Sequence, residues 1–393
     1  MVEPAPQGLF SDTEAQADAK TDAGPIHSTG VVPSQGLRRA IERGEIKSTE
    51  PISEEQIQPA SLDLRLGPVA YRTRASFLPG RNATVGQKIE TYGMHQFSLD
   101  DGAVLETGCV YLVPLMESLH LPYRTSAMAN PKSSTGRLDV FCRLITDEGT
   151  EFDHVRSGYH GPLWVEILPR SFSILVETGT RLLQLRVKQG APRWSDTALR
   201  ELHSEVRLID DDVVFEENLK RGLLAITVDA QGIGDTDLIG WRARKNTDLI
   251  DISKIDHYDP IDFWEPMHAQ SDQGVILDPN DFYILSSRES VTVPADHAAE
   301  MLAYDTLVGE FRVHYAGFFD PGFGVAEYGG EGTRAVLEVR SRDVPFMIED
   351  GQVVGRLMYE RLTALPDKLY GRDIGSNYQR QGLALSKQFK RPR

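Results

Sequence analysis

The chain has 393 residues, 40% hydrophobic and 25% charged, a composition typical of a water-soluble protein long enough for two or three domains. Its net charge of −16 argues against a general role on nucleic acid or a membrane surface, but a few local cations could still hold a small anion. No apolar run is long enough for a transmembrane helix, and the N-terminus lacks a signal-peptide pattern. The two cysteines, Cys109 and Cys142, form neither a disulfide framework nor a C-x-x-C pair. We therefore expect a cytoplasmic protein.

The expected elements follow in chain order. Residues 1–30 are rich in Ala, Asp, Glu, Pro and Thr and are expected to form a disordered leader. A short helix is predicted over 34–46 with Ser34 as its N-cap, and a connecting helix over 195–206. Short alternating runs that indicate strands lie at 61–67, 109–115, 163–169, 172–178, 181–187, 223–229 and 357–362. Many short strands separated by turns predict an all-β fold of the barrel or sandwich type.

One pattern occurs twice. Residues 104–137 match 276–310 when Pro122 is aligned with Pro294, and residues 158–187 match 330–362 in the same order. The second copy keeps the apolar and turn positions but has Tyr304, Asp305 and Thr306 in place of a basic and hydroxyl cluster. We therefore predict a duplicated fold whose polar chemistry is divided between the copies. The predicted organisation is a first domain at 31–192, a connecting segment at 193–215, a second domain at 216–366 and a tail or lid at 367–393.

The first copy contains PKSSTGR at 131–137, which places two cations and three hydroxyls on a turn of small residues. The groups of Lys132, Ser133, Ser134 and Arg137 suit the oxygens of a polyphosphate, although the pattern is not a Walker loop. Taken alone, the same residues would also fit a solvated turn or a helix cap.

Glu166 and Glu338 occupy matching positions in two apolar strands, LWVEI and AVLEV. A partly buried carboxylate has a raised pKa and can move protons. The alternative interpretation is that strand alternation points each glutamate toward solvent. Recurrence in both copies favours the first interpretation.

Two segments of the second half combine glycines with aromatic residues. HYAGFFDPGFG at 314–324 predicts a tight hairpin whose backbone could read the edge of a flat base, or else an ordinary core hairpin. YGRDIGSNYQRQG at 370–382 predicts either a disordered tail or a lid over a ligand.

Taken together and in this order, these stretches resemble the dCTP deaminase family, a branch of the trimeric dUTPase-like fold. Residues 58–74 resemble its first β segment, and PKSSTGR resembles its R-S-S-x-x-R phosphate motif with Lys132 at the usual arginine. The likeness covers most of 33–385, and the length resembles the long, internally duplicated bacterial form. The implied fold class is all-β dominated, with two tandem dUTPase-like β-barrels (β-clip or jelly-roll-like) and a few short helices.

The resemblance also implies a composite site, because the family's active sites lie between subunits. The phosphate grip would come from Lys132, Ser133, Ser134 and Arg137 of the first half. The base and the reaction would fall to Ala316, Asp320 and the catalytic Glu338 of the second half, with Glu166 as the alternative catalytic carboxylate. The tail would add Tyr370, Tyr378 and Gln381. Two family residues are missing, since Phe318 replaces the hairpin arginine and Asn377 the tail lysine.

The implied activity is hydrolytic deamination of dCTP to dUTP and ammonia in pyrimidine deoxynucleotide biosynthesis, by water that a glutamate activates. Zinc is not expected, since the H-x-E and P-C-x-x-C motifs are missing, and Mg²⁺ would be held through the triphosphate. One alternative is a bifunctional enzyme that forms dUMP and pyrophosphate, with Asp320 or Asp139 activating the second water. Another is a non-catalytic nucleotide-binding homologue. Implied partners are dCTP, dTTP as a feedback inhibitor, and further copies of the chain in a trimer or a smaller pseudo-symmetric assembly, with no nucleic acid or membrane.

Overall fold

The computed structural model describes residues 27–191, 195–234, 236–269, 274–302, 311–313, 317–326, 332–341, 344–371 and 383–391. Most of the predicted leader lies outside these ranges. The leader prediction is wrong at its end, because Gly30 is already in a strand, paired with Gln189. Among the described residues, no helix combines the length and apolar character needed to cross a membrane.

The first half consists mainly of antiparallel sheets. One sheet has the order β1-β13-β8-β10 with β3 beside β13, and the other has the order β5-β4-β7-β11-β9 with β2 beside β7. The strands are β1 (Gly30–Val31), β2 (Ile46–Ser48), β3 (Leu62–Arg65), β4 (Val69–Thr73), β5 (Gly93–Ser98), β6 (Ala103–Leu105), β7 (Val110–His120), β8 (Thr125–Pro131), β9 (Val140–Thr146), β10 (His154–Val155), β11 (His160–Pro169), β12 (Ile174–Val176) and β13 (Arg181–Gln189). The helices are α1 (Ser34–Glu42), η1 (Glu54–Gln56), α2 (Val85–Tyr92) and α3 (Ser133–Gly136).

The second half repeats this plan with sheets β14-β15-β26-β21-β23 and β18-β16-β20-β24-β22, and β19 pairs with β25. The strands are β14 (Leu219–Lys220), β15 (Leu223–Thr227), β16 (Leu238–Ala243), β17 (Ile250–Asp251), β18 (Trp264–His268), β19 (Val275–Leu277), β20 (Phe282–Val291), β21 (His297–Leu302), β22 (Phe311–Val313), β23 (Phe318–Phe319), β24 (Thr333–Ser341), β25 (Phe346–Ile348) and β26 (Val353–Arg361). The helices are α4 (Asp196–Glu205), α5 (Asp212–Asn218) and α6 (Pro260–Phe263).

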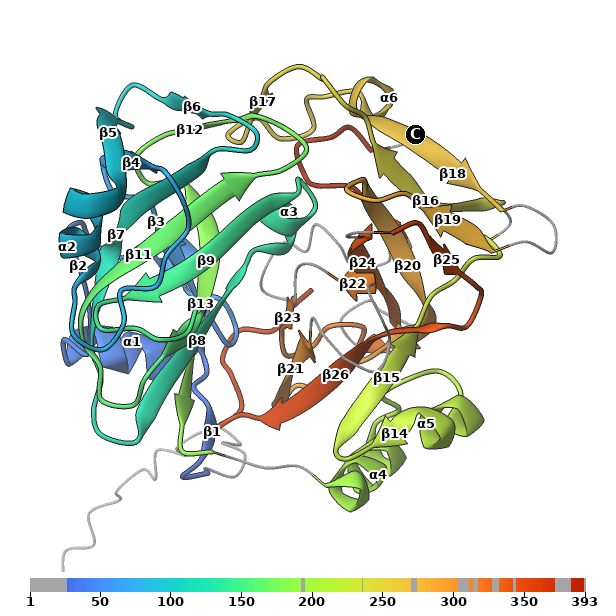
Figure 1. The fold of residues 1–393 in the computed structure, drawn as a ribbon. Coiled ribbons are helices and arrows are strands. Elements are labelled where there is room, and N and C mark those ends of the chain that lie inside the picture. Colours follow the sequence, from blue (N-terminus) through green and yellow to red (C-terminus); the bar gives the residue numbers. More distant parts are fainter. Residues whose placement is uncertain are drawn as a thin grey trace, which may run out of the picture.

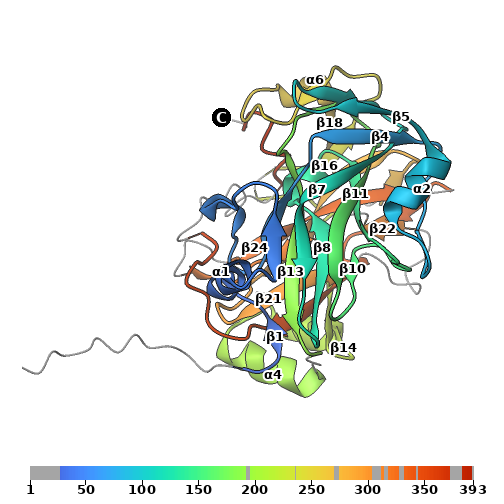
Figure 2. The same ribbon diagram turned by 90° about the vertical axis from the view of Figure 1, so that its left-hand side faces the viewer.

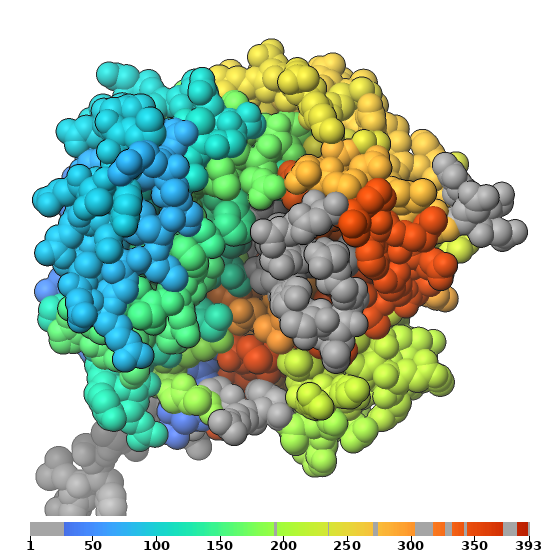
Figure 3. All heavy atoms as spheres, viewed as in Figure 1, coloured from blue at the N-terminus to red at the C-terminus, as the bar shows by residue number. Residues whose placement is uncertain are grey.

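The strand bounds reproduce the repeat seen in the sequence. β6, β12 and β13 have counterparts in β19, β25 and β26 at one constant offset, and β7, β8 and β11 match β20, β21 and β24 within a residue or two. The predicted fold class is therefore confirmed: strands dominate, helices are short, and two similar units follow each other. Figures 1 and 3 show the two halves as lobes side by side, the first in blue to green and the second in yellow to red.

The two predicted helices both form, but their caps differ. α4 begins as expected, with the Ser195 hydroxyl accepting a hydrogen bond from the amide of Ala198. The prediction for Ser34 is wrong, because the N-cap of α1 is Pro33 and the Ser34 hydroxyl donates instead to Asp367. A partner from the far end of the chain outweighs the local capping preference here.

The two halves are joined by shared packing rather than by surface contact alone. β12 of the first half pairs in parallel with β17, which belongs to the second. Trp264 and Phe263 pack on Phe172 with ring centroids 5.3 and 5.8 Å apart, and all three rings are buried. Figure 2, viewed from the side of the first half, shows β8 and β13 standing in front of β21 and β24. The surface between the halves is thus a continuous interior, in which polar groups need partners.

Candidate active site

A cavity of about 290 Å³ lies between the two halves. Its lining is contributed by both copies of the repeat and contains most of the described residues that the sequence singled out. From the first half come Asp63, Lys132, Ser133, Ser134, Arg137 and Arg181, and from the second come Phe318, Asp320, Arg334, Glu338, Tyr370 and Lys387. The structure therefore brings together segments about 200 residues apart in the chain.

The PKSSTGR segment forms the first-half wall of this cavity. β8 ends at Pro131, the chain stays extended at Lys132, and residues 133–136 form the single turn α3. The turn is fixed to the strand β13, because the Lys132 amide and the Thr135 hydroxyl both donate to the carbonyl of Leu182, at 2.9 and 3.0 Å. The ammonium of Lys132 forms an ion pair with Asp63, and Arg181 lies 3.9 Å from the same carboxylate. Cations and hydroxyls are thus presented to the cavity by a rigid strand.

Glu338 lies opposite this wall, on β24. Its side chain is 8% exposed, and its Oε1 lies 3.8 Å from Nε of Arg137 across the boundary between the halves. Burial raises the pKa of Glu338 to about 7, and Arg137 opposes part of that rise. A carboxyl group whose pKa lies near neutrality exists in both protonation states under working conditions, as proton transfer requires.

Glu166 occupies the matching position on β11 but has different surroundings. Its carboxylate accepts hydrogen bonds from Nη2 and Nε of Arg143, at 2.6 and 3.1 Å, and it does not line the cavity. Arg143 is itself held by Ser76 and by the ring of Phe152. Both glutamates are buried, so the interpretation that alternation points them to solvent is wrong. The structure brings Glu338, and not Glu166, to the phosphate motif.

Asp320 follows β23 at the start of the predicted hairpin turn. The turn needs glycine at 324, where φ is +72° and a Cβ atom would collide with the carbonyl of Val291. Burial raises the pKa of Asp320 to about 6, against the opposing charge of Arg186. Ala316, predicted to bind the base, lies outside the described residues.

Arg186 is a residue of this region that the sequence interpretation missed. It comes from β13, is fully buried, and lies 3.6 Å from the carboxylate of Asp320. Its Nη1 and Nη2 donate to the carbonyls of Ala299 and Phe319, at 3.0 and 3.3 Å, and its guanidinium lies 3.9 Å from the ring centroid of Phe318. An arginine inside an apolar strand was the available signal, since such a cation is rarely buried without a polar partner.

Asp139 does not face the cavity. Its carboxylate forms an ion pair with Arg340 and accepts a hydrogen bond from the hydroxyl of Ser171 at 2.6 Å. Arg340 lies two residues after Glu338, and Asp139 two residues after Arg137. Two neighbouring ion pairs therefore join the halves. In one the first half supplies the cation, Arg137, and in the other it supplies the anion, Asp139. The two pairs together fix the position of β24 along the phosphate motif.

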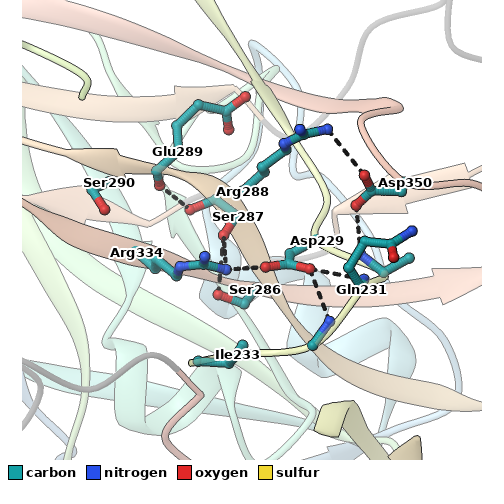
Figure 4. A network of polar contacts seen from close by, with 12 residues as sticks. Asp229, Gln231, Ile233, Ser286, Ser287, Arg288, Glu289, Ser290, Arg334 and Asp350 are labelled. Atoms are coloured by element: carbon teal, nitrogen blue, oxygen red, sulfur yellow. Dashed lines mark hydrogen bonds and ion pairs between the residues drawn. The ribbon is translucent and has the colours of Figure 1, made fainter. Parts of the chain in front are cut away.

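Arg334 lines the cavity and belongs to the polar network shown in Figure 4. Its guanidinium pairs with Asp229 and lies 3.3 Å from the carbonyl of Ser287. The second carboxylate oxygen of Asp229 accepts from the amides of Gln231 and Gly232, at 2.9 and 3.1 Å. The network anchors this cation to the loop that follows β15.

Of the predicted tail residues, Tyr370 lines the cavity, its amide donating to the carbonyl of Pro321 at 2.9 Å and its ring lying 5.7 Å from that of Phe323. Tyr378 and Gln381 lie outside the described residues.

Comparison with known proteins places this two-lobed fold in one family. Models of the N-terminal and C-terminal domains of 2'-deoxycytidine 5'-triphosphate deaminase (DCD) match residues 28–191 and 195–389. The chain therefore belongs to the dCTP deaminase family, as its motifs predict, and is a nucleotide deaminase by family.

Individual relatives agree with this assignment. The crystal structure of 2'-deoxycytidine 5'-triphosphate deaminase from Agrobacterium tumefaciens is 50% identical, covers 86% of this chain and 100% of that one, and superposes with a TM-score of 0.81. A protein of Leifsonia xyli is 30% identical over 46% of this chain and 90% of its own length, and one of Nocardioides sp. is 28% identical over 44% and 90%. Both are named "dCTP deaminase, dUMP-forming".

Proposed function

We propose that the cavity between the halves binds dCTP and that Glu338 moves the protons of its deamination. The observation that carries this proposal is the position of Glu338, a buried carboxyl group of near-neutral pKa, 3.8 Å from the last cation of the phosphate motif. A nucleotide whose phosphates are held at Lys132–Arg137 would have its base next to this carboxylate.

The proposed reaction consumes one water and releases ammonia. Glu338 in its ionised form takes a proton from the water that attacks C4 of cytosine and delivers it to N3. The carboxylate then takes the proton of the new C4 hydroxyl and passes it to the amino group, so that ammonia leaves as the C4 carbonyl forms. The positive charge of Arg137 favours the ionised form that begins the cycle. Ser133 and Ser134 would donate to phosphate oxygens, and the cations would neutralise their charge.

Metal dependence is part of the same proposal. Mg²⁺ would be bound by the triphosphate, since it prefers phosphate oxygens and retains water, and it would complement the cations of the cavity wall. Proton transfer through Glu338 is proposed to need no zinc, because the motifs that hold zinc in other deaminases are missing from the sequence.

We further propose that the reaction continues to dUMP and pyrophosphate. The curated relatives carry the dUMP-forming name, and the cavity contains a second carboxyl group of raised pKa, that of Asp320, whose side chain is 13% exposed. Its ionised form could take a proton from a water that attacks the α-phosphorus of dUTP, with pyrophosphate as the leaving group. Asp139, the other candidate for this step, has its carboxylate engaged by Arg340 and Ser171.

The product balance tests this second step. With dCTP as substrate, we expect one pyrophosphate for each ammonia and little free dUTP. Asp320→Asn, which keeps the shape of the side chain, should lower the rate of pyrophosphate release by about 100-fold or more, the range of an acid–base group. Ammonia release should fall less, so that dUTP accumulates. Stoichiometric dUTP without pyrophosphate from the unaltered protein would show that only deamination takes place.

Arg186 should act as a positioning residue for the hairpin. Arg186→Met removes two hydrogen bonds to hairpin-side carbonyls and the cation beside Asp320. We expect kcat/KM for dCTP to fall about 10- to 100-fold, the effect of small misplacements. Because Arg186 lowers the pKa of Asp320, that pKa should rise further, and the acidic limb of pyrophosphate release should move to higher pH.

The matched control is Lys188→Met. Lys188 lies two residues further along β13, is also buried, and pairs with Glu300 and Glu360 outside the cavity. The Lys188→Met variant should lower the stability of the fold without moving the pH profile of pyrophosphate release. Arg186→Lys should restore part of kcat/KM. If the pH profile of pyrophosphate release is unchanged in Arg186→Met, Arg186 has only a structural role.

Regulation and assembly complete the proposal. The resemblance implies inhibition by dTTP and association of several chains, which added dTTP in the ammonia assay and light scattering at working concentrations would test. Tight dCTP binding without ammonia release would instead support the non-catalytic homologue.

A further inference from the structure

Residues 383–391, here called the C-terminal clasp, lie across the phosphate motif. The hydroxyl of Ser386 donates to the carbonyl of Ser134 at 2.6 Å, and Nη1 of Arg137 donates to the carbonyl of Ala384 at 2.7 Å. Lys387, which follows Ser386 in the chain, lines the cavity. The clasp therefore contributes a wall of the site.

The clasp is anchored in the shared core. The ring of Phe389 is buried among those of Phe263, Trp264 and Tyr258, with centroids 5.5, 6.0 and 6.3 Å away. The amide side chain of Gln388 donates to the carbonyl of Ile252 at 2.9 Å, and the carbonyl of Lys387 accepts from the amide of Asp256 at 2.9 Å. Lys387 is thus held on both sides by backbone contacts, and its position does not depend on a loose chain end.

The surroundings of Lys387 leave positive charge uncompensated. Lys387 has no ion pair with any residue that the structure describes. Its neighbours Lys132 and Arg181 are cations that already share Asp63. Burial lowers the pKa of Lys387 from its usual range, and repulsion by these two cations lowers it further. A second carboxylate, that of Glu55, lies 3.8 Å from Arg181, but its side chain is 84% exposed, so solvent screens much of its charge. Three cations around the buried Asp63, in a cavity and next to serine hydroxyls, are arranged as a site that a polyanion would complete.

We propose that Lys387 is a further phosphate-binding residue, delivered by the clasp to a polyphosphate held at Lys132–Arg137. The identity of the ligand as a nucleoside triphosphate rests on the proposed function, whereas the recognition of a polyphosphate chain does not. In this arrangement Lys387 belongs to the end of the cavity marked by Lys132 and Arg181. Glu338 lies beside Arg137, the other end of the motif. The lysine thus acts in binding rather than in proton transfer.

The test uses the full chain and inorganic triphosphate as the probe, measured by calorimetry. Lys387→Met keeps the length of the side chain and removes the charge. We expect it to weaken triphosphate binding and raise KM for dCTP by about 10- to 100-fold, as for loss of a charged hydrogen bond. The kcat should stay within about 3-fold of the unaltered value, and Lys387→Arg should recover most of the affinity.

Lys390→Met is the matched control, because Lys390 lies in the same clasp but is exposed and away from the cavity. It should bind triphosphate like the unaltered protein. Equal triphosphate affinity in Lys387→Met and Lys390→Met, at an unchanged melting temperature, would overturn the proposal. Because the binding measurement needs no turnover, failure of the deamination proposal would be recognised separately, by the absence of ammonia while triphosphate still binds through Lys387.

Discussion

Replacement of Glu338 by glutamine should abolish ammonia release from dCTP while leaving dCTP binding largely intact. Glutamine keeps the size of the side chain and a hydrogen-bonding carbonyl, but it cannot accept the proton of the attacking water. Acid–base groups contribute about 10²- to 10⁴-fold, so the rate should fall at least by that range. Steady-state ammonia release and equilibrium dCTP binding measure the two effects independently.

Glu166→Gln is the matched control, since Glu166 lies at the same position of the other copy but pairs with Arg143 outside the cavity. This variant should keep turnover, with some loss of stability. Normal turnover in Glu338→Gln together with an inactive Glu166→Gln would refute the assignment of Glu338.

The same carboxyl group predicts the pH dependence of the unaltered protein. Burial raises the pKa of Glu338 to about 7, so the fraction of ionised carboxylate falls as the pH drops below that value. Because the ionised form begins the reaction, kcat/KM for ammonia release should decrease about tenfold per pH unit well below pH 7. A rate independent of pH between 5 and 8 would contradict a role for this group as the base.

The second large effect concerns stability and the ion pair of Arg340 with Asp139. Both side chains are buried, and the pair joins the two halves beside the site. Arg340→Met leaves the Asp139 carboxylate buried without its cation, which should destabilise the fold by about 3–5 kcal/mol. Urea unfolding followed by intrinsic fluorescence would measure the loss.

The double variant Asp139→Asn with Arg340→Met removes both charges and should recover part of that loss, because no buried charge is left unpaired. Arg200→Met serves as the surface control, since Arg200 and Glu216 form an exposed ion pair and little change is expected. A loss in Arg340→Met no larger than in Arg200→Met would show that the buried pair does not hold the halves together.

The local sequence predicted the elements well where local forces decide them. Alternating apolar residues separated by turns indicated the strands, and the constant offset between copies reappears in β12 and β25. The helix after residue 195 also forms as expected. Ser34 failed as a cap because Asp367, which no local pattern can indicate, offers its hydroxyl a carboxylate acceptor.

For the site, the sequence by itself determined which residue types are present, and their likeness to one family indicated the kind of ligand. It favoured Glu338, whose half keeps the F-D-P-G hairpin and the tail, but left Glu166 as the alternative because both lie at the same position of the same strand pattern. Tertiary structure separates their surroundings: Glu166 pairs with Arg143 of the same half, while Glu338 meets Arg137 of the other half beside a cavity. Lys387 was likewise revealed only by folding, as were the partners of Arg186, although its place in an apolar strand was a signal in the sequence. Each of them meets groups that are more than a hundred residues away in the chain. The electrostatic energy of such a contact depends on distance and burial, and the spacing of residues in the sequence gives neither.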